Sequence, residues 1–577
     1  MANRKQAKGK VKPSIVHWRF LTVLVVISLV FTGLAVRAAY IQVVSPDMLI
    51  EQGDNRTIRT KKRQVHRGII YDRNGEELAV SVPVRAIWAD PKTIHQRNGL
   101  ASKKRWEALA DVLGRDVDDL IQRVNNPKRR FVYLQRQVSE AMADYVAQLK
   151  IPGVYLRNES RRYYPTGEVS AHLIGFTDVD DKGLEGIERI YDKRLSGTPD
   201  SRKVRQDIKG RPVELLSASE GKKPKDIHLT IDQRIQALTY KELKKAVTLL
   251  KATSGSAVVA NVHTGELLAL VNSPSFNPNN RRGVAPHRIR NRAVTDTFEP
   301  GSTVKPLAVL SALEFGSAEA STVIKTAPGY MRIGGRYVRD SKNYGDLDLT
   351  GIIQKSSNMG TSKLALSVPK RQFIDMYYEL GLIGDTGSNL IGESGGIFHE
   401  RNRWSDFELA TLSFGYGISV TTLQLARMYT TLGNGGIRKP LTIIKSDNPI
   451  VEGERALTAS TANAVVEMME TVVMDGGTGT KAQVPGYRVA GKTGTSRKAV
   501  AGGYGEEYVN IFAGLAPVSD PQLAVVVLIN EPSGDLYYAG DTAAPVFSKV
   551  MAGTLQMLNI PPDNKNVSSL VANREGH

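Results

Sequence analysis

Three short groups of residues in this chain could together carry out nucleophilic acyl transfer. They are Ser302 and Lys305 in FEPGSTVKP, Ser356 and Asn358 in QKSSNMG, and Lys492 at the start of KTGT. A serine hydroxyl becomes an effective nucleophile when a neighbouring base takes its proton. A deprotonated lysine can act as that base, provided that burial or a second cation lowers its pKa.

The first group favours a serine and a lysine on one helix face. Glu-Pro-Gly predicts a turn, after which Ser302 begins a helix and Lys305 occupies the next turn. Residues three apart share a helix face, so the amine can reach the hydroxyl, and the helix N-terminus stabilises a developing alkoxide. Lys492 is the expected second cation. Alone, the pattern is weak, because a serine N-cap followed by a solvated lysine is common.

The second group predicts a polar loop. A hydroxyl at Ser356 could relay a proton, and the amide of Asn358 could hold a substrate carbonyl. Taken alone, Ser356-Ser357-Asn358 is equally well an ordinary N-cap before a helix. The three groups in this order, each in suitable local structure, make a strong combined pattern.

The third group also fits a phosphate-binding loop, because Gly486 through Thr493 satisfies G-x-x-x-x-G-K-[ST]. Such a loop requires a strand, a glycine-rich turn and then a helix. Here the variable positions are Tyr-Arg-Val-Ala, which prefer a strand, and GTSRKAVAGGYGEEY starts no helix. We therefore predict that Lys492 lies on a β-strand and not in a nucleotide site.

The N-terminus predicts a membrane anchor. Residues 1–19 contain six basic groups and no acid, and Phe20–Val36 carries no charge. A single helix over 20–44 would cross a hydrocarbon core of roughly 30 Å. A cleaved signal peptide usually has a shorter apolar run, and Arg37 interrupts the plausible cleavage region. A buried core helix is the remaining alternative. The basic leader places residues 1–19 in the cytoplasm and the chain beyond about residue 45 outside.

Composition narrows the function classes. A chain of 577 residues with 41% hydrophobic and 23% charged residues is globular and has two or more domains. The net charge of +19 is dispersed, which favours anionic lipid or wall polymer over nucleic acid. The absence of cysteine excludes disulfides and a thiol nucleophile, and the nine histidines lack zinc-site spacing. We expect no metal and no cofactor.

The pattern of elements predicts an α/β chain with an antiparallel sheet in its C-terminal two-thirds. Helices are expected at 101–125 and 138–150, and a hairpin or linker at 201–226. A hairpin follows in SGSAVVANV and LLALVNSPS, and LAVVVLINEP (523–532) is an apolar strand run before a helix near 543–558. The predicted divisions are a leader 1–19, a membrane helix 20–44, an N-terminal domain 45–225, a second domain 226–560 and a flexible tail 561–577.

The chain resembles the penicillin-binding proteins, and closely the class B, division-specific D,D-transpeptidases of Gram-negative bacteria (the FtsI type). RGIIYDRNG, RRYYPTGEVSAHLIGF and GLEGIE look like the three motifs of that class's N-terminal pedestal, while SFGYGISVTTLQLA and AAPVF look like core segments. The resemblance covers nearly the whole chain. It gives a structural role to Arg67, Arg161, Asp72 and Glu188, which by themselves suggest surface ions or salt bridges. It implies a penicillin-binding/serine β-lactamase-like α+β domain with flanking helices, preceded by an elongated α+β pedestal and one transmembrane helix.

The resemblance also implies a mechanism. Ser302 would attack the penultimate D-alanine carbonyl of a peptidoglycan stem peptide, and an amine of a neighbouring stem would take the acyl group. Lys305 would be the base, and Ser356 and Asn358 would relay the proton and position the donor. The segment Lys492, Thr493, Gly494 and Thr495 would bind the substrate, with its terminal carboxylate held by Lys492 and the two threonines. The backbone N–H groups of Ser302 and Thr495 would form the oxyanion hole.

The implied partners are stem peptides of lipid II-derived nascent glycan, β-lactams, the inner membrane, a septal glycan polymerase and other division proteins, without nucleic acid. The implied location is the inner membrane at the septum, with the catalytic domain in the periplasm. Two alternatives remain. One is a hydrolase, either a D,D-carboxypeptidase or a serine β-lactamase, although no E-x-x-L-N segment is present. The other is a β-lactam sensor or a catalytically silent scaffold.

Overall fold

The computed structural model describes residues 16–44, 46–62, 66–198, 200–207, 211–401, 403–446, 452–500, 502–534 and 536–564. Most of the predicted leader and of the predicted tail lies outside these residues. Contacts divide the chain into two compact units. The first comprises Met1–Val65 and Thr198–Lys223, and the second comprises His66–Gly197 and Pro224–His577.

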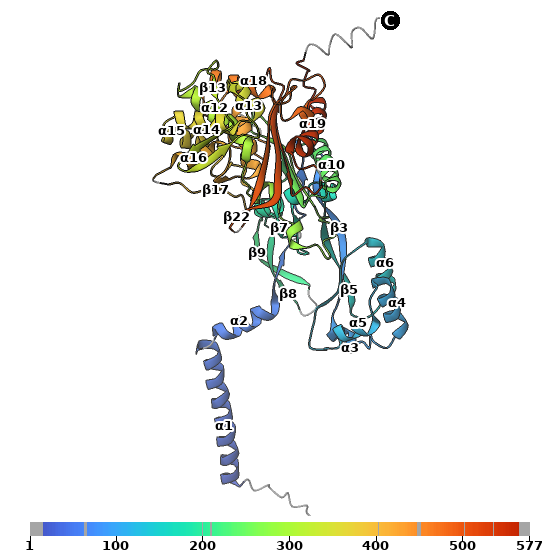
Figure 1. Ribbon diagram of the computed structural model, residues 1–577. Helices are drawn as coiled ribbons and strands as arrows, with labels where there is room; N and C mark the ends of the chain where they lie inside the picture. Colours follow the sequence, from blue (N-terminus) through green and yellow to red (C-terminus); the bar gives the residue numbers. More distant parts are fainter. Residues whose placement is uncertain are drawn as a thin grey trace, which may run out of the picture. The chain divides into compact units, whose positions relative to one another are not determined.

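The first unit begins with the apolar helix. α1 spans His17–Ala39 and continues as a π-helical turn over Tyr40–Val44, so the helix starts three residues before the expected position (Figure 1). The stretch His17–Val43 has a mean hydropathy of 2.3, and none of it is buried. Its length and composition are sufficient to cross a membrane.

The rest of the first unit is α2 (Pro46–Thr57) and a three-stranded sheet. The sheet contains β1 (Ile58–Lys62), β8 (Ser201–Gln206) and β9 (Pro212–Ser219), paired antiparallel in that order. Of the two alternatives for the segment 201–226, the hairpin is therefore confirmed.

The second unit begins with a helix-covered sheet. Its long strands are β3 (Glu77–Ala89), β4 (Val132–Val138) and β5 (Val154–Tyr163). Short strands β2 (Ile70–Tyr71) and β10 (Ile227–His228) extend it. Four helices pack on one face around Trp106 and Leu120 (Figure 1), namely α3 (Pro91–Gln96), α4 (Lys103–Leu113), α5 (Val117–Val124) and α6 (Glu140–Gln148).

The single helix expected over 101–125 is two helices. Gly114 ends α4 in the left-handed conformation, with φ of 60°, which a glycine adopts without steric cost. Asp116 then starts α5, because its carboxylate accepts hydrogen bonds from the N–H groups of Asp118 and Asp119. The helix expected over 138–150 corresponds to α6.

The pedestal motifs form a buried ionic cluster and not a set of surface ions. Glu188, in α8 (Gly186–Ile190), is fully buried and accepts from Arg67 Nε and Arg162 Nε, each at 2.6 Å. Arg161 lies outside this cluster, and its Nη2 donates to Asn279 O at 3.4 Å. Neighbouring side chains on β5 point to opposite faces, so Arg162 enters the cluster while Arg161 stays exposed. Asp72 is also fully buried and accepts from Gln233 N at 3.1 Å.

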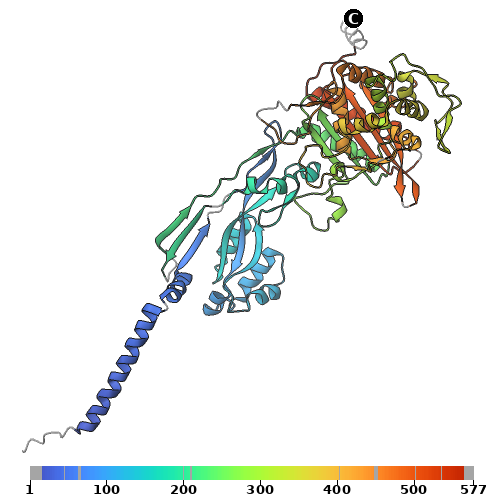
Figure 2. The ribbon, with the colours of Figure 1, turned by 90° about the vertical axis from the view of Figure 1, so that its left-hand side faces the viewer.

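The larger sheet of the second unit is antiparallel, in the order β12-β11-β23-β22-β21. Figure 2 shows its green strands beside its orange and red ones, so segments far apart in the sequence meet in one sheet. Its strands are β11 (Ser254–Asn261), β12 (Leu267–Ser273), β21 (Ala490–Val500), β22 (Gly503–Ala516) and β23 (Leu523–Asn530). The hairpin and the apolar strand that the sequence predicts are thereby confirmed.

Helices cover both faces of this sheet, which explains the uninterrupted apolar run of β23. α10 (Gln233–Leu249) and α19 (Ala539–Met557) pack on one face with Val525 and Val527 (Figure 1). The other face, with Val526, packs on a helical layer. That layer includes α12 (Lys305–Glu314), α13 (Leu349–Lys355), α14 (Asn358–Ser367), α15 (Lys370–Glu379), α16 (Asp406–Ser413), α17 (Thr422–Gly433) and α18 (Ala459–Glu470).

Candidate active site

The nucleophile candidate lies in a tight turn before a helix. Gly301, with φ of +53°, opens the 3₁₀ turn η4 (Gly301–Val304), which contains Ser302, and α12 starts at Lys305. The expected single helix is thus a 3₁₀ turn followed by an α-helix. Ser302 is half-buried, whereas Lys305 is only 1% exposed.

The first two groups meet at Ser356. This residue ends α13 in the left-handed conformation, with φ of 58°, and precedes α14. Lys305 Nζ donates to Ser356 O at 2.5 Å and to Ser356 Oγ at 3.1 Å. Among the described residues no hydrogen bond joins Lys305 to Ser302, so the contacts of the amine are with the second group.

Lys492 reaches the same hydroxyl from the third group. It is fully buried, and its Nζ donates to Ser356 Oγ at 2.9 Å. Burial lowers the pKa of Lys305 to about 7, although the negative charge of Asp340 acts in the opposite direction. Burial and the neighbouring Lys305 hold the pKa of Lys492 well below its usual range. At least one of the two amines is therefore ready to accept a proton at neutral pH.

The strand that carries Lys492 excludes a nucleotide-binding loop. Lys492 and Thr493 lie inside β21 and pair with Ala513 and Phe512 of β22. β21 leads directly to β22, so no helix follows the glycines, as a phosphate site would require.

β21 lies directly against the turn that bears Ser302. A Cβ atom added to Gly494 would be 2.7 Å from Thr303 Cγ2 and 2.9 Å from Pro300 O. Ser496, which is buried, donates from Oγ to Glu299 O at 2.9 Å. Glycine at 494 is therefore what permits the close approach of strand and turn.

The hydroxyls of the two threonines of this strand have hydrogen-bond partners other than Ser356. Thr493 Oγ1 bonds Thr478 Oγ1 at 2.7 Å, and Thr495 Oγ1 accepts from Ala539 N, at the start of α19, at 3.0 Å. A cavity of about 420 Å³ beside this region is lined in part by Glu299 and Ser496.

One acidic residue that the sequence did not suggest organises the second group. Asp340 follows β15 (Arg336–Arg339), and its carboxylate accepts from Ser357 Oγ at 2.6 Å, Asn358 N at 2.5 Å and Met359 N at 3.0 Å. It thus caps the N-terminus of α14. Asn358 Nδ2 also donates to Arg339 O at 2.7 Å. RYVRDSKNY contains no pattern that points to this role, because the contact depends on a neighbouring hairpin.

Comparisons with known proteins agree on one family. The family described as "Penicillin binding protein transpeptidase domain" matches residues 255–552, and "Penicillin-binding Protein dimerisation domain" matches residues 62–229. The chain is 49% identical over 562 residues to "Peptidoglycan D,D-transpeptidase FtsI" of Escherichia coli K12, covering 97% of this chain and 95% of that relative.

Solved structures agree with these matches. A peptidoglycan synthetase from Bifidobacterium adolescentis superposes with a TM-score of 0.70 at 27% identity, covering 88% of this chain and 98% of that one. Penicillin binding protein 3 from Mycobacterium tuberculosis, complexed with aztreonam, superposes with a TM-score of 0.68 at 28% identity, covering 87% and 98%. The fold class predicted from the sequence is confirmed.

Proposed function

Because this chain belongs to the penicillin-binding proteins, and within them to the class B peptidoglycan D,D-transpeptidases of the FtsI type, we propose that Ser302 is the nucleophile of its cross-linking reaction. One observation carries the assignment. Two buried lysines, Lys305 and Lys492, converge on Ser356 Oγ beside the turn that bears Ser302. Such a group can take a proton from a serine and pass it on.

In the acylation step, neutral Lys305 accepts the Ser302 hydroxyl proton while Oγ attacks the penultimate D-alanine carbonyl. A pKa of about 7 leaves a substantial fraction of the amine unprotonated at neutral pH. The C–N bond to the terminal D-alanine then breaks, and its nitrogen receives a proton through Ser356. Terminal D-alanine leaves, and the stem peptide stays attached to Ser302 as an ester.

β21 supplies groups that stabilise the two negative charges of the reaction, on the oxyanion and on the terminal carboxylate. The backbone N–H groups of Ser302 and Thr495 form the oxyanion hole, an arrangement that the contact of Gly494 with the turn supports. Lys492 and the hydroxyls of Thr493 and Thr495 bind the terminal carboxylate. Asn358, whose amide is held by Arg339 O, positions the donor peptide.

An amine of a neighbouring stem peptide completes the reaction. It attacks the ester carbonyl and gives up a proton, Ser302 Oγ leaves and takes a proton back through Lys305, and the two stems are joined by an amide bond. A β-lactam follows the first half of this course, because opening of its ring also acylates Ser302, and the product is hydrolysed slowly. β-Lactam binding is a property of the transpeptidase family to which the chain belongs.

The chain is a membrane-anchored, division-related member of this family. We place residues 1–19 in the cytoplasm, a membrane helix at 20–44 and the rest in the periplasm at the septum, with a pedestal at 45–225 and a transpeptidase domain at 226–560. The apolar helix and the basic leader support this topology. A pedestal without a catalytic group of its own favours dependence on a separate septal glycan polymerase.

Intact mass after exposure to benzylpenicillin tests the assignment of Ser302. The full chain should gain one drug mass that persists for minutes, and Ser302→Ala should gain none. Rapid drug hydrolysis without an adduct would indicate a β-lactamase. A folded chain with neither adduct nor hydrolysis would overturn the catalytic proposal, and a catalytically silent scaffold would then be the remaining function.

A further inference from the structure

One end of the subdomain built from β3–β5 and α3–α6 forms a single surface. We call it the basic tip and define it as residues 90–105, 125–131 and 149–153. Hydrogen bonds connect the three segments. Lys92 N donates to Arg129 O at 3.1 Å, Asp90 N donates to Gly153 O at 2.8 Å, and Arg105 Nη1 donates to Lys150 O at 3.1 Å.

The charge of the basic tip is almost entirely of one sign. Nine exposed basic residues lie in it, namely Lys92, Arg97, Lys103, Lys104, Arg105, Lys128, Arg129, Arg130 and Lys150. Its one carboxylate, Asp90, is buried and paired with Arg130 at 3.2 Å. Lys103 also lies 3.9 Å from Glu107, just outside the tip, so seven of the nine basic residues have no acidic partner among the described residues, and the surface presents a net excess of positive charge to solvent.

Aromatic rings border the basic tip. Trp88 stacks on Phe131 with ring centroids 4.9 Å apart and lies 4.8 Å from the ring of Tyr155. Phe131 is 44% exposed and Tyr155 is 41% exposed. Because Ile87 and Ala89 face the helices, Trp88 faces the opposite side of the sheet.

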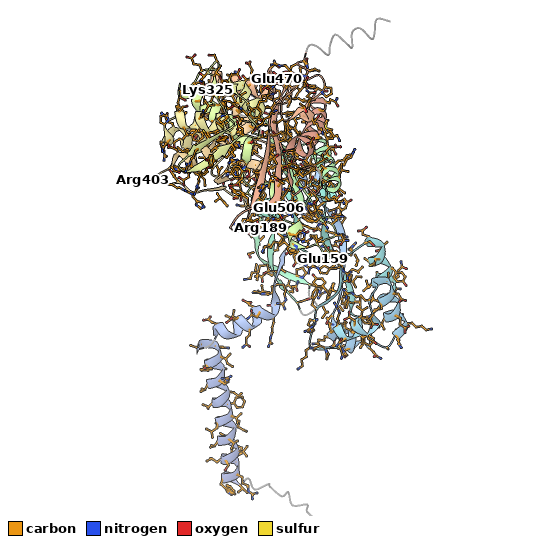
Figure 3. All side chains as sticks on the ribbon, in the orientation of Figure 1. Glu159, Arg189, Lys325, Arg403, Glu470 and Glu506 are labelled. Carbon is orange, nitrogen blue, oxygen red and sulfur yellow. The ribbon has the colours of Figure 1, made fainter. Side chains whose placement is uncertain are left out.

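On the sheet face that carries Trp88 and Tyr155, an acidic side chain of β5 lies further from the tip. Glu159, labelled in Figure 3, lies four residues beyond Tyr155 on β5 and pairs with Arg136 at 2.9 Å. The aromatic rings thus lie between the Glu159–Arg136 pair and the basic residues of the tip. Positive charge next to the half-buried ring of Trp88 and the exposed rings of Phe131 and Tyr155 is a composition that a lipid headgroup region favours.

We propose that the basic tip docks on the anionic lipid surface of the membrane that anchors the chain. The twenty-one residues 45–65 join the apolar helix to the second unit, and because Pro46–Thr57 is helical they span at most about 50 Å. This tether keeps the tip at a high effective concentration near the membrane, so weak individual contacts suffice. Docking would restrict the positions that the attached catalytic domain can sample.

An anionic wall polymer is the other occupant with the right charge. The basic residues would serve either occupant, and Trp88, Phe131 and Tyr155 add the aromatic surface that is enriched where proteins meet a membrane interface. The link through residues 45–65 also raises the effective concentration of the tip at the membrane, whereas it gives the polymer no such advantage. The lipid surface is therefore the better fit, and the polymer becomes an outcome of the test.

The test uses the full chain, which contains no cysteine, so that one introduced thiol can be labelled at a single site. Ala101→Cys places an environment-sensitive dye on an exposed position of the basic tip. The protein is inserted into nanodiscs of phosphatidylcholine with or without phosphatidylglycerol. We expect spin-labelled lipids to quench the dye only with phosphatidylglycerol, and added salt to reverse the quenching, since the Debye length is about 10 Å at 0.1 M.

Two matched pairs of substitutions separate the basic tip from general charge. Lys128→Gln with Arg129→Gln should lower the equilibrium constant for docking about 25-fold, since each basic residue at an anionic surface contributes about fivefold. Lys241→Gln with Lys245→Gln, at exposed positions of α10, should change nothing. Acylation by benzylpenicillin should be unchanged in both and so reports folding.

Three results would overturn the proposal. They are equal quenching in both kinds of nanodisc, equal effects of the two variant pairs, and no quenching in phosphatidylglycerol discs. If soluble peptidoglycan fragments shift the emission of the dye while anionic lipid does not, the tip binds wall polymer instead.

Discussion

Lys305 and Lys492 donate to one acceptor, Ser356 Oγ, at 3.1 and 2.9 Å, from a helix and from an edge strand of the sheet. Both side chains are buried. Two ammonium groups so close in a low-dielectric site repel one another, so the pair loses its first proton easily. The hydroxyl between them is a natural relay, because it can accept from one amine while donating elsewhere.

The acylation rate should depend on pH through this pair. Only neutral Lys305 can accept the Ser302 proton, and its pKa is about 7. We expect the second-order rate constant for a fluorescent penicillin to rise as pH increases through about 7 and to level off above it. Lys305→Met should lower the rate constant by roughly 10³-fold, and the remaining rate should no longer rise as pH increases through about 7. A rate in the native protein that stays constant across neutral pH would contradict this assignment.

Burial of Lys305 should cost stability at neutral pH. Its folded pKa, about 7, is below the unfolded value of about 10.4, so the unfolded state binds more protons between these two values. Stability therefore falls as pH decreases from about 10.4 to about 7 and changes little below that. Lys305→Met should raise the free energy of unfolding by roughly 1–4 kcal/mol at pH 7. Thermal unfolding measured at neutral and alkaline pH should show the difference shrinking as pH rises.

Asp340 should act as a positioning residue. Asp340→Asn removes the negative charge that caps α14 and that raises the pKa of Lys305. We expect a roughly 10–100-fold slower acylation and a shift of its pH midpoint to lower pH. The stability loss should be about 1 kcal/mol.

Asp348 provides the matched control for that substitution. It caps α13 through Gly351 N at 2.7 Å and has no hydrogen bond to Asn358. Asp348→Asn should therefore lose a similar amount of stability without moving the pH midpoint. Equal midpoints in the two variants would show that Asp340 serves the fold alone.

Gly494→Ala should separate β21 from the nucleophile turn. The new methyl group would lie under 3 Å from Thr303 Cγ2 and Pro300 O, so either the strand or the turn must move. Since a displacement of about 1 Å can cost 10²-fold in rate, we expect acylation to fall about 100-fold in a folded protein. Gly395→Ala, where the new atom would find only ordinary contacts, should leave the rate unchanged.

Glu188 should determine the stability of the pedestal part of the second unit. Glu188→Gln leaves Arg67 and Arg162 without their shared buried counter-charge. Removing one partner of a buried ion pair typically costs about 3–5 kcal/mol, and we expect a loss of that size in urea unfolding. Glu107→Gln disrupts an exposed pair with Lys103 and should change stability by less than about 0.5 kcal/mol.

Much of the larger sheet follows from local pattern. The hairpin of β11 and β12, the apolar strand β23 and the strand around Lys492 were all predictable, because side-chain alternation and turn residues act within a few positions. The end of α4 at Gly114 was not predicted, since one glycine inside a helical pattern can either be tolerated within a helix or end it. Arg162, which enters the buried cluster, was not singled out beside Arg161, because the sequence does not tell which face of β5 is covered.

For the candidate site, the sequence by itself determined which side chains are chemically able to take part, namely a serine, two lysines and an asparagine in three separated groups. Only the tertiary structure decided what they touch. It directed Lys305 to Ser356, brought Lys492 to the same hydroxyl, and added Asp340 from a neighbouring hairpin. The reason is physical: spacing along a chain limits local geometry, whereas burial, pKa and the meeting of distant groups depend on how the elements pack.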